Sequence, residues 1–160
     1  MTSTPLTTCL WFDGQAEEAV DFYLSVFKDS SRGRVGRYSE AGPGVAGSVL
    51  TAEFTVNGQQ FVALNGGPQF HFDEAISFQI HCADQAEVDY YWSALLEGGG
   101  EEGPCGWLKD RFGLSWQVVP DEFIEMISGS DQRKAARATE KMMTMKKLDI
   151  AELRRAYEGS

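Results

Sequence analysis

Apolar and polar residues follow two similar arrangements along the chain, one in each half. In the first half, an apolar run at residues 7–12 precedes a stretch from Ala16 to Phe27 in which apolar residues recur every three or four positions. That spacing predicts one buried strand and one amphipathic helix. After a turn rich in Ser, Gly and Arg, three further β-like runs follow, at 35–38, 47–56 and 59–65. Asn57-Gly58 separates the last two runs and predicts a tight hairpin.

The second half repeats this order. An apolar run at 76–82 predicts a strand, and Asp84-x-x-Glu87 is a capping box that starts a second amphipathic helix. Three glycines at 98–100 end that helix. One or two brief strands around 107–109 precede a closing strand that follows Gly113.

A triplet supports internal duplication. Gln15-Ala16-Glu17 and Gln85-Ala86-Glu87 are identical, and each opens a helix that follows an apolar strand. The same order of elements around both triplets predicts two copies of one βαβββ unit.

The last forty residues lie outside the repeat and predict helices at 123–127, 131–145 and 148–157, the third with Asp149 as a candidate cap. The fold class is therefore α+β. We expect a single domain over 1–160, with a first βαβββ unit at 6–67, a shortened second unit at 75–120 and a helical tail at 121–160.

Charge narrows the range of partners. The chain has 24 Asp and Glu residues against 14 Lys and Arg, which gives a net charge of −10. Binding to nucleic acid or to an anionic membrane depends on basic residues, so neither partner is expected. No apolar run reaches the length of a membrane span, and no basic signal segment opens the chain. A cytoplasmic protein with its three cysteines reduced is the expectation.

Three segments carry a family resemblance: CLWFDGQAEEAVDFY, ALNGGPQFHFDEAISFQIHC and CGWLKDRFGLSWQVVP. They resemble the vicinal oxygen chelate superfamily, which includes glyoxalase I and the extradiol dioxygenases. Within it the chain is similar to the PhnB-like branch, often labelled 3-demethylubiquinone-9 3-methyltransferase. The resemblance implies a cupped, mostly antiparallel eight-stranded sheet, a small-molecule ligand in the cup and a homodimer.

The same resemblance implies four positions where related proteins hold a divalent cation. They fall at Thr8 or Cys9, at Val62, at Phe78 or Gln79, and at Gln117. One thiol and two amides are poor ligands for such an ion. His71 and His81 fall outside these positions. We expect no metal and no other cofactor. Two alternatives stay open: a metal-dependent lyase or dioxygenase of this fold, and a structural dimer whose cup is filled by its own side chains.

The methyltransferase label has no support in the residues. A nucleotide-binding methyltransferase needs a Gly-rich turn that leads from a strand into a helix. No helical pattern follows Asn65-Gly66-Gly67-Pro68, and Gly98-Gly99-Gly100 ends a helix. We therefore do not expect methyl transfer.

Candidate site residues are those placed to face the cup or to stand in loops at its rim. Gln79 and Gln117 are amides inside otherwise apolar strands, and a buried amide needs a partner. Cys105, in a Gly-Pro-Cys-Gly loop, and Asp110, in a segment that also reads as a turn, are candidates for catalysis. The candidate ligand-binding residues are Cys9, Trp11, Asn65, Phe72, Gln79, Trp107, Trp116 and Gln117. For most of them a purely structural role is the alternative.

Overall fold

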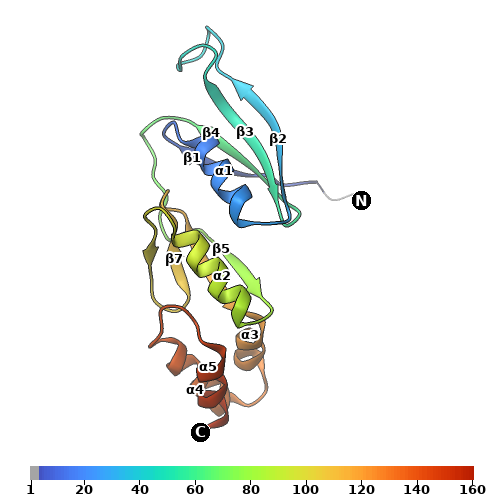
Figure 1. Ribbon diagram of the computed structural model, residues 1–160, viewed down its shortest axis with the longest axis vertical. Coiled ribbons are helices and arrows are strands. Elements are labelled where there is room, and N and C mark those ends of the chain that lie inside the picture. Colours follow the sequence, from blue (N-terminus) through green and yellow to red (C-terminus); the bar gives the residue numbers. More distant parts are fainter. Residues whose placement is uncertain (1–3) are drawn as a thin grey trace. The chain divides into compact units, whose positions relative to one another are not determined.

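The computed structural model describes residues 4–160 and divides into two compact units, one ending at Phe72 and the other beginning at Asp73 (Figure 1). Each unit contains a four-stranded sheet and a helix that packs on one of its faces. The predicted α+β class and the tandem βαβββ order are confirmed. In each sheet one pair of strands is parallel and the other two pairs are antiparallel.

The first unit builds its sheet in the order β1-β4-β3-β2, with β1 and β4 parallel. Its elements are β1 (Thr8–Phe12), α1 (Ala16–Val26), β2 (Ser30–Arg37), β3 (Val49–Val56) and β4 (Gln59–Asn65). The apolar face of α1 packs on this sheet, where the rings of Tyr23, Phe54 and Phe61 stack at centroid separations of 5.9 and 5.1 Å. Asn57 and Gly58 both have positive φ, which confirms the predicted hairpin turn.

Strand β2 differs from the prediction. It begins at Ser30, inside the segment predicted to be a turn, and pairs with β3 as an edge strand. Most of its side chains are exposed, so its sequence SSRGRVGR shows no apolar alternation. Hydrogen bonds to β3 and the side-chain pair of Arg34 with Glu53 make it a strand.

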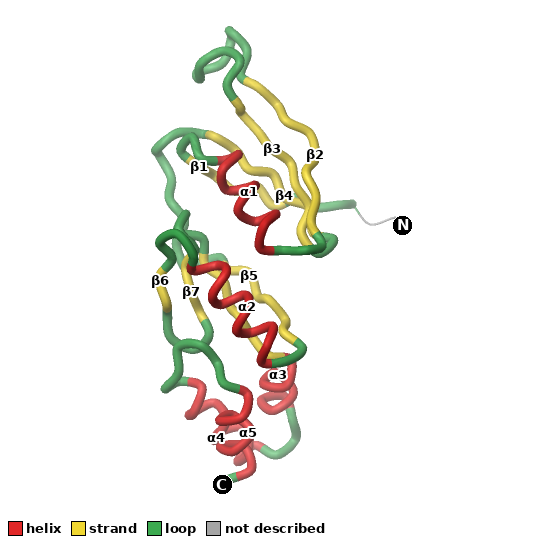
Figure 2. Tube along the Cα trace, in the orientation of Figure 1, coloured by secondary structure: helices red, strands yellow, loops and turns green. Residues whose placement is uncertain are grey.

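The second unit repeats the order as β5-β8-β7-β6, with β5 and β8 parallel. Its elements are β5 (Ser77–Cys82), α2 (Gln85–Leu96), β6 (Glu101–Glu102), β7 (Trp107–Lys109) and β8 (Ser115–Pro120) (Figure 2). The capping box is confirmed, because Asp84 Oδ1 accepts from the Glu87 backbone N–H at 2.9 Å. The Glu87 carboxylate accepts in turn from the backbone of Ala83.

The tail folds against the end of the second unit as α3 (Asp121–Ser128), α4 (Gln132–Met142) and α5 (Ile150–Glu158). Its buried cluster consists of Val119, Phe123, Met126, Ala138, Leu148 and Leu153. Asp149 caps α5 as predicted, but α4 ends at Met142 instead of 145. Turns follow there, and Thr144 and Met145 donate to the carbonyls three residues before them.

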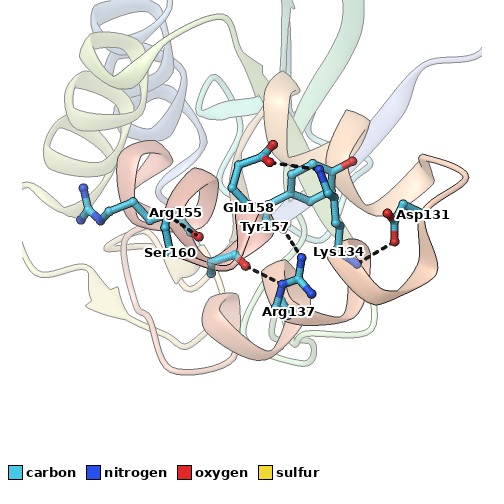
Figure 3. A network of polar contacts seen from close by, with 8 residues as sticks. Asp131, Lys134, Arg137, Arg155, Tyr157, Glu158 and Ser160 are labelled. Carbon is cyan, nitrogen blue, oxygen red and sulfur yellow. Dashed lines mark hydrogen bonds and ion pairs between the residues drawn. The ribbon is translucent and has the colours of Figure 1, made fainter.

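A polar network joins α4 to α5 (Figure 3). The Arg137 guanidinium donates to the carbonyls of Ala156 at 3.0 Å and Tyr157 at 2.8 Å, and Lys134 Nζ donates to Glu158 at 3.0 Å. Across residues 4–160 no helix is both long and apolar enough to cross a bilayer.

Candidate ligand-binding site

Each sheet carries its helix on one face, and the opposite face is called its open face. Strand register assigns every side chain to one of the two faces. In the first sheet, Cys9 pairs with Val62 on the open face, whereas Thr8 pairs with the buried Phe61. In the second sheet, Gln79 pairs with Gln117 on the open face, whereas Phe78 pairs with the buried Trp116. The register therefore selects Cys9 and Gln79 among the predicted alternatives.

The two glutamines hydrogen-bond to each other on the open face of the second sheet. Gln79 Nε2 donates to Gln117 Oε1 at 3.0 Å, and Gln117 Nε2 donates to Ser77 Oγ at 2.8 Å. Trp107 is the register partner of Gln117 on β7 and is half-buried. Gln79, Gln117 and Trp107 thus form one row across this face, and their contact with a ligand stays a prediction.

A pocket of about 510 Å³ lies within the second unit, at the β6–β7 side of the sheet. Trp107 and Cys105, both predicted from the sequence, line it together with the sequence neighbours Pro104 and Leu108. Its remaining lining residues are Glu74, Glu101, Glu102, Gly103, Lys109 and Ser115. Lys109 and Glu74 form an ion pair here.

Cys105 owes its place to the tail. Its φ of 60° is unusual for a residue with a side chain, and its backbone N–H donates to Met145 O at 2.8 Å. Gly106 N–H donates to Lys146 O at the same distance. The thiol of Cys105 is partly exposed. The loop that forms one wall of the pocket is therefore held by the segment between α4 and α5.

Asp110 lies in the core, with only 3 % of its surface exposed. Oδ1 accepts from the backbone N–H groups of Phe112 at 2.9 Å and Leu114 at 3.1 Å, and Oδ2 accepts from Trp116 Nε1 at 3.0 Å. The carboxylate thus organises the turn between β7 and β8 and fixes the indole of Trp116. Trp116 itself is 5 % exposed on the helix-covered face, so the structure does not bring these two candidates to the pocket.

In the first unit, the candidates have local structural contacts. Asn65 Oδ1 accepts from the backbone N–H of Ala16 at the start of α1, and Nδ2 donates to Val49 O. Trp11 Nε1 donates to Gly67 O at 2.8 Å. Phe72 packs edge-on against Phe12 at 5.4 Å. Asn65 also lines a second, more polar pocket of about 750 Å³ within the first unit, where Arg37, Tyr38 and Glu17 contribute.

The polar lining of the pocket in the second unit is not predicted from the sequence: it consists of Ser115, Lys109, Glu74, Glu101 and Glu102. For Ser115 a signal exists, because it stands two positions before Gln117 and shares its face of the strand. For Glu101 the sequence holds no such signal, because a strand of two residues is too short to show alternation of apolar and polar residues.

Cys82 is buried whereas Cys9 is exposed, so the two thiols are expected to differ in reactivity. Desolvation raises the pKa of Cys9, and desolvation, reinforced by nearby carboxylates, raises the pKa of Cys82 to about 12. A raised pKa leaves less thiolate at a given pH, and the thiolate is the nucleophile. At pH 8 we expect iodoacetamide to leave Cys82 unmodified in the native protein and to alkylate Cys9 more slowly than a cysteine in an unfolded peptide. Peptide mass spectrometry measures both, and faster alkylation of Cys9 than of the peptide would contradict this expectation.

The repeated βαβββ units with paired open-face positions define the vicinal oxygen chelate fold. Within it, the chain belongs to the family described as 3-demethylubiquinone-9 3-methyltransferase, the PhnB-like proteins, which matches residues 4–119. The PhnB protein from Bacillus cereus, whose structure bears the same methyltransferase name, is 36% identical; the alignment covers 73% of this chain and 99% of that chain, with a TM-score of 0.64. The resemblance predicted from the sequence is confirmed.

Two more distant structures show the fold alone. A protein from Pseudomonas aeruginosa is 21% identical, over 74% of this chain and 98% of that chain, with a TM-score of 0.60. The fosfomycin resistance protein FosX from Listeria monocytogenes, complexed with Mn(II) and sulfate, is 19% identical, over 74% of this chain and 92% of that chain, with a TM-score of 0.52. No curated protein matches the chain.

The residues at the four equivalent positions do not fit a divalent cation. Cys9, Val62, Gln79 and Gln117 offer one thiol, one hydrocarbon side chain and two amides, and the amides are engaged with each other. Glu53, the neighbour of Val62 on β3, is held by a bidentate pair with Arg34. Within residues 4–160 no group of three or more His, Cys, Asp or Glu side chains could hold a metal ion.

Proposed function

We propose that this PhnB-like protein binds a small, partly apolar molecule on the open face of its second sheet, without a metal ion. One observation carries the proposal: the pocket of about 510 Å³ beside Trp107. Its volume falls in the range of about 300–1,000 Å³ in which proteins hold small ligands. Trp107 and Pro104 supply apolar surface, and a few polar groups stand among them, which is the composition of such sites.

The chemistry of the open face favours binding over the alternatives. A lyase or dioxygenase of this fold that works through a cation would need carboxylate or imidazole ligands, and the four positions hold neither. A methyltransferase of the nucleotide-binding type needs a parallel sheet, and each sheet here has one parallel pair. The proposed homodimer and the cytoplasmic location follow from the family resemblance and the composition, and both stay predictions.

Binding is testable with an apolar probe, ethylnaphthalene, followed by calorimetry on protein treated with a chelator. We expect the probe to bind equally well before and after chelation. Trp107→Ala should weaken binding by at least about tenfold, because a large aromatic ring is the main apolar contact. The matched control is Phe70→Ala, which removes an exposed ring of the first unit and should leave binding unchanged.

Elemental analysis of protein purified without chelator tests the absence of a metal. A stoichiometric content of Zn, Ni, Mn or Fe that is lost in Gln117→Ala would contradict the metal-free proposal. Binding of the probe to wild type and to Trp107→Ala with equal affinity would contradict the location of the site.

A further inference from the structure

Ser115 is a buried hydroxyl whose partner is missing. Its side chain is 1 % exposed, and among residues 4–160 its Oγ is the only buried side-chain nitrogen or oxygen without a hydrogen-bond partner. Buried polar groups are nearly always paired, because an unpaired one loses its bonds to water and gains nothing in return. The unpaired Ser115 Oγ is therefore a candidate to form a hydrogen bond with a ligand, that is, with a group outside residues 4–160.

The position of Ser115 indicates that such a ligand would bind in the pocket beside Trp107. Ser115 lines the pocket beside Trp107, and its register partners on the open face are Ser77 on β5 and Lys109 on β7. The Ser77 hydroxyl is already engaged, since it accepts from Gln117. The unpaired hydroxyl thus stands in a pocket whose apolar surface comes from Pro104 and the indole of Trp107.

The charges of the pocket restrict what can enter. Three carboxylates line it, those of Glu74, Glu101 and Glu102, and the ammonium of Lys109 is the one cationic group that the described chain contributes to the lining. Glu102 is engaged by the Trp92 indole N–H at 3.2 Å and lies 3.9 Å from Lys146 Nζ, so Glu101 supplies the remaining negative charge. Lys109 is paired with Glu74 and faces Glu101 across β6 and β7, and the bond to Glu74, with added attraction from Glu101, raises the pKa of its ammonium group. The positive charge of Lys109 is therefore already compensated, and an anionic ligand would meet a negative surface.

We propose that this pocket takes an uncharged or cationic molecule with a flat apolar body and one hydrogen-bonding group that reaches Ser115, and that it discriminates against anions. The inference rests on the proposed function, because it names the ligand class of the same pocket. The apolar body lies against Trp107, and a cationic group gains from both the indole and the carboxylates.

Four naphthalene probes with one common ring system test this ligand class: ethylnaphthalene, naphthylethanol, naphthylethylamine and naphthylacetate. Calorimetry on the full chain gives the four dissociation constants. We expect the alcohol and the amine to bind about tenfold more tightly than the hydrocarbon, as one added hydrogen bond to a buried group allows. Naphthylacetate should bind most weakly of the four.

Variants assign these differences to residues. Ser115→Ala should weaken the alcohol and the amine about tenfold and leave ethylnaphthalene unchanged. Ser93→Ala removes an exposed hydroxyl on α2, outside the pocket lining, and should leave all four constants unchanged. Glu101→Gln should weaken the amine about threefold, strengthen naphthylacetate and leave the alcohol unchanged, because only charge is removed.

The outcomes distinguish a wrong ligand class from a wrong binding function. If ethylnaphthalene binds but Ser115→Ala leaves the alcohol and amine unchanged, or if naphthylacetate binds most tightly, the ligand class is overturned and the binding function stands. If none of the four probes binds to the wild-type protein, the proposed function is overturned, and the ligand class with it.

Discussion

Replacing Asp110 with alanine is expected to lower the free energy of unfolding of the second unit by about 4 kcal/mol, since each buried donor left unpaired costs about 1–3 kcal/mol. The carboxylate accepts from two backbone N–H groups and from the Trp116 indole, and it is almost fully buried. Urea unfolding followed by tryptophan fluorescence measures the effect, because three of the four tryptophans lie in the second unit.

Two control variants separate hydrogen bonding from other effects. Asp110→Asn keeps the shape of the side chain and one acceptor oxygen, but its amide N–H₂ group faces one of the N–H donors and cannot accept from it. We therefore expect the free energy of unfolding to fall by about half as much as in Asp110→Ala. Asp131→Ala removes an exposed helix cap that accepts from Lys134 N–H, and should cost about 1 kcal/mol. If Asp110→Ala costs no more than Asp131→Ala, the three bonds do not stabilise the native state as described.

The elements that the sequence predicts well are those whose signals are local. The amphipathic periods of α1 and α2, the turn at Asn57-Gly58 and the caps Asp84 and Asp149 each depend on residues within a few positions of one another. Only the last part of strand β2 was predicted, as the run at 35–38, because pairing with β3 makes residues 30–34 a strand while their own side chains are polar and exposed. An edge strand that buries little carries little hydrophobic pattern.

The candidate site was predictable where alternation along a strand determines which way a side chain faces. Gln79, Gln117 and Cys9 lie on the open faces as expected, because their strands are correctly placed. The contacts of Asn65 with Ala16, and of Trp116 with Asp110, are formed by folding and have no local signal. The pocket depends on β6 and β7, strands of two and three residues, so its outline could not be predicted.

The helical tail lies beyond the family match at 4–119. Its attachment to the second unit is specific. Gln85 at the start of α2 donates from Nε2 to Leu148 O at 3.0 Å and accepts at Oε1 from Ile150 N–H at 2.8 Å. The matching residue of the first unit, Gln15, precedes α1 without a side-chain cap bond. Of the two repeated glutamines, Gln85 links its unit to the tail.

Leu153→Ala is expected to lower the free energy of unfolding by about 3 kcal/mol, as for other fully buried leucines. Leu153 is fully buried in the tail cluster with Leu148 and Phe123. If tail and second unit unfold together, tryptophan fluorescence and far-ultraviolet circular dichroism shift to lower urea by the same amount. The control is Leu6→Ala in the first unit, where the side chain is 89% exposed, with an expected cost under about 0.5 kcal/mol.

The alternative outcome has a different physical meaning. A tail that unfolds by itself would lose helical signal at low urea while the fluorescence of Trp92, Trp107 and Trp116 kept its wild-type midpoint. The bonds from Cys105 and Gly106 to the segment 145–146 argue against that separation, because the pocket wall and the tail share them. Separate unfolding of the tail would also free the loop beside Trp107, and in that case Leu153→Ala would weaken ethylnaphthalene binding at urea concentrations below the midpoint of the sheet. Unchanged binding in a variant whose tail has unfolded would show that the pocket wall holds its position without the tail.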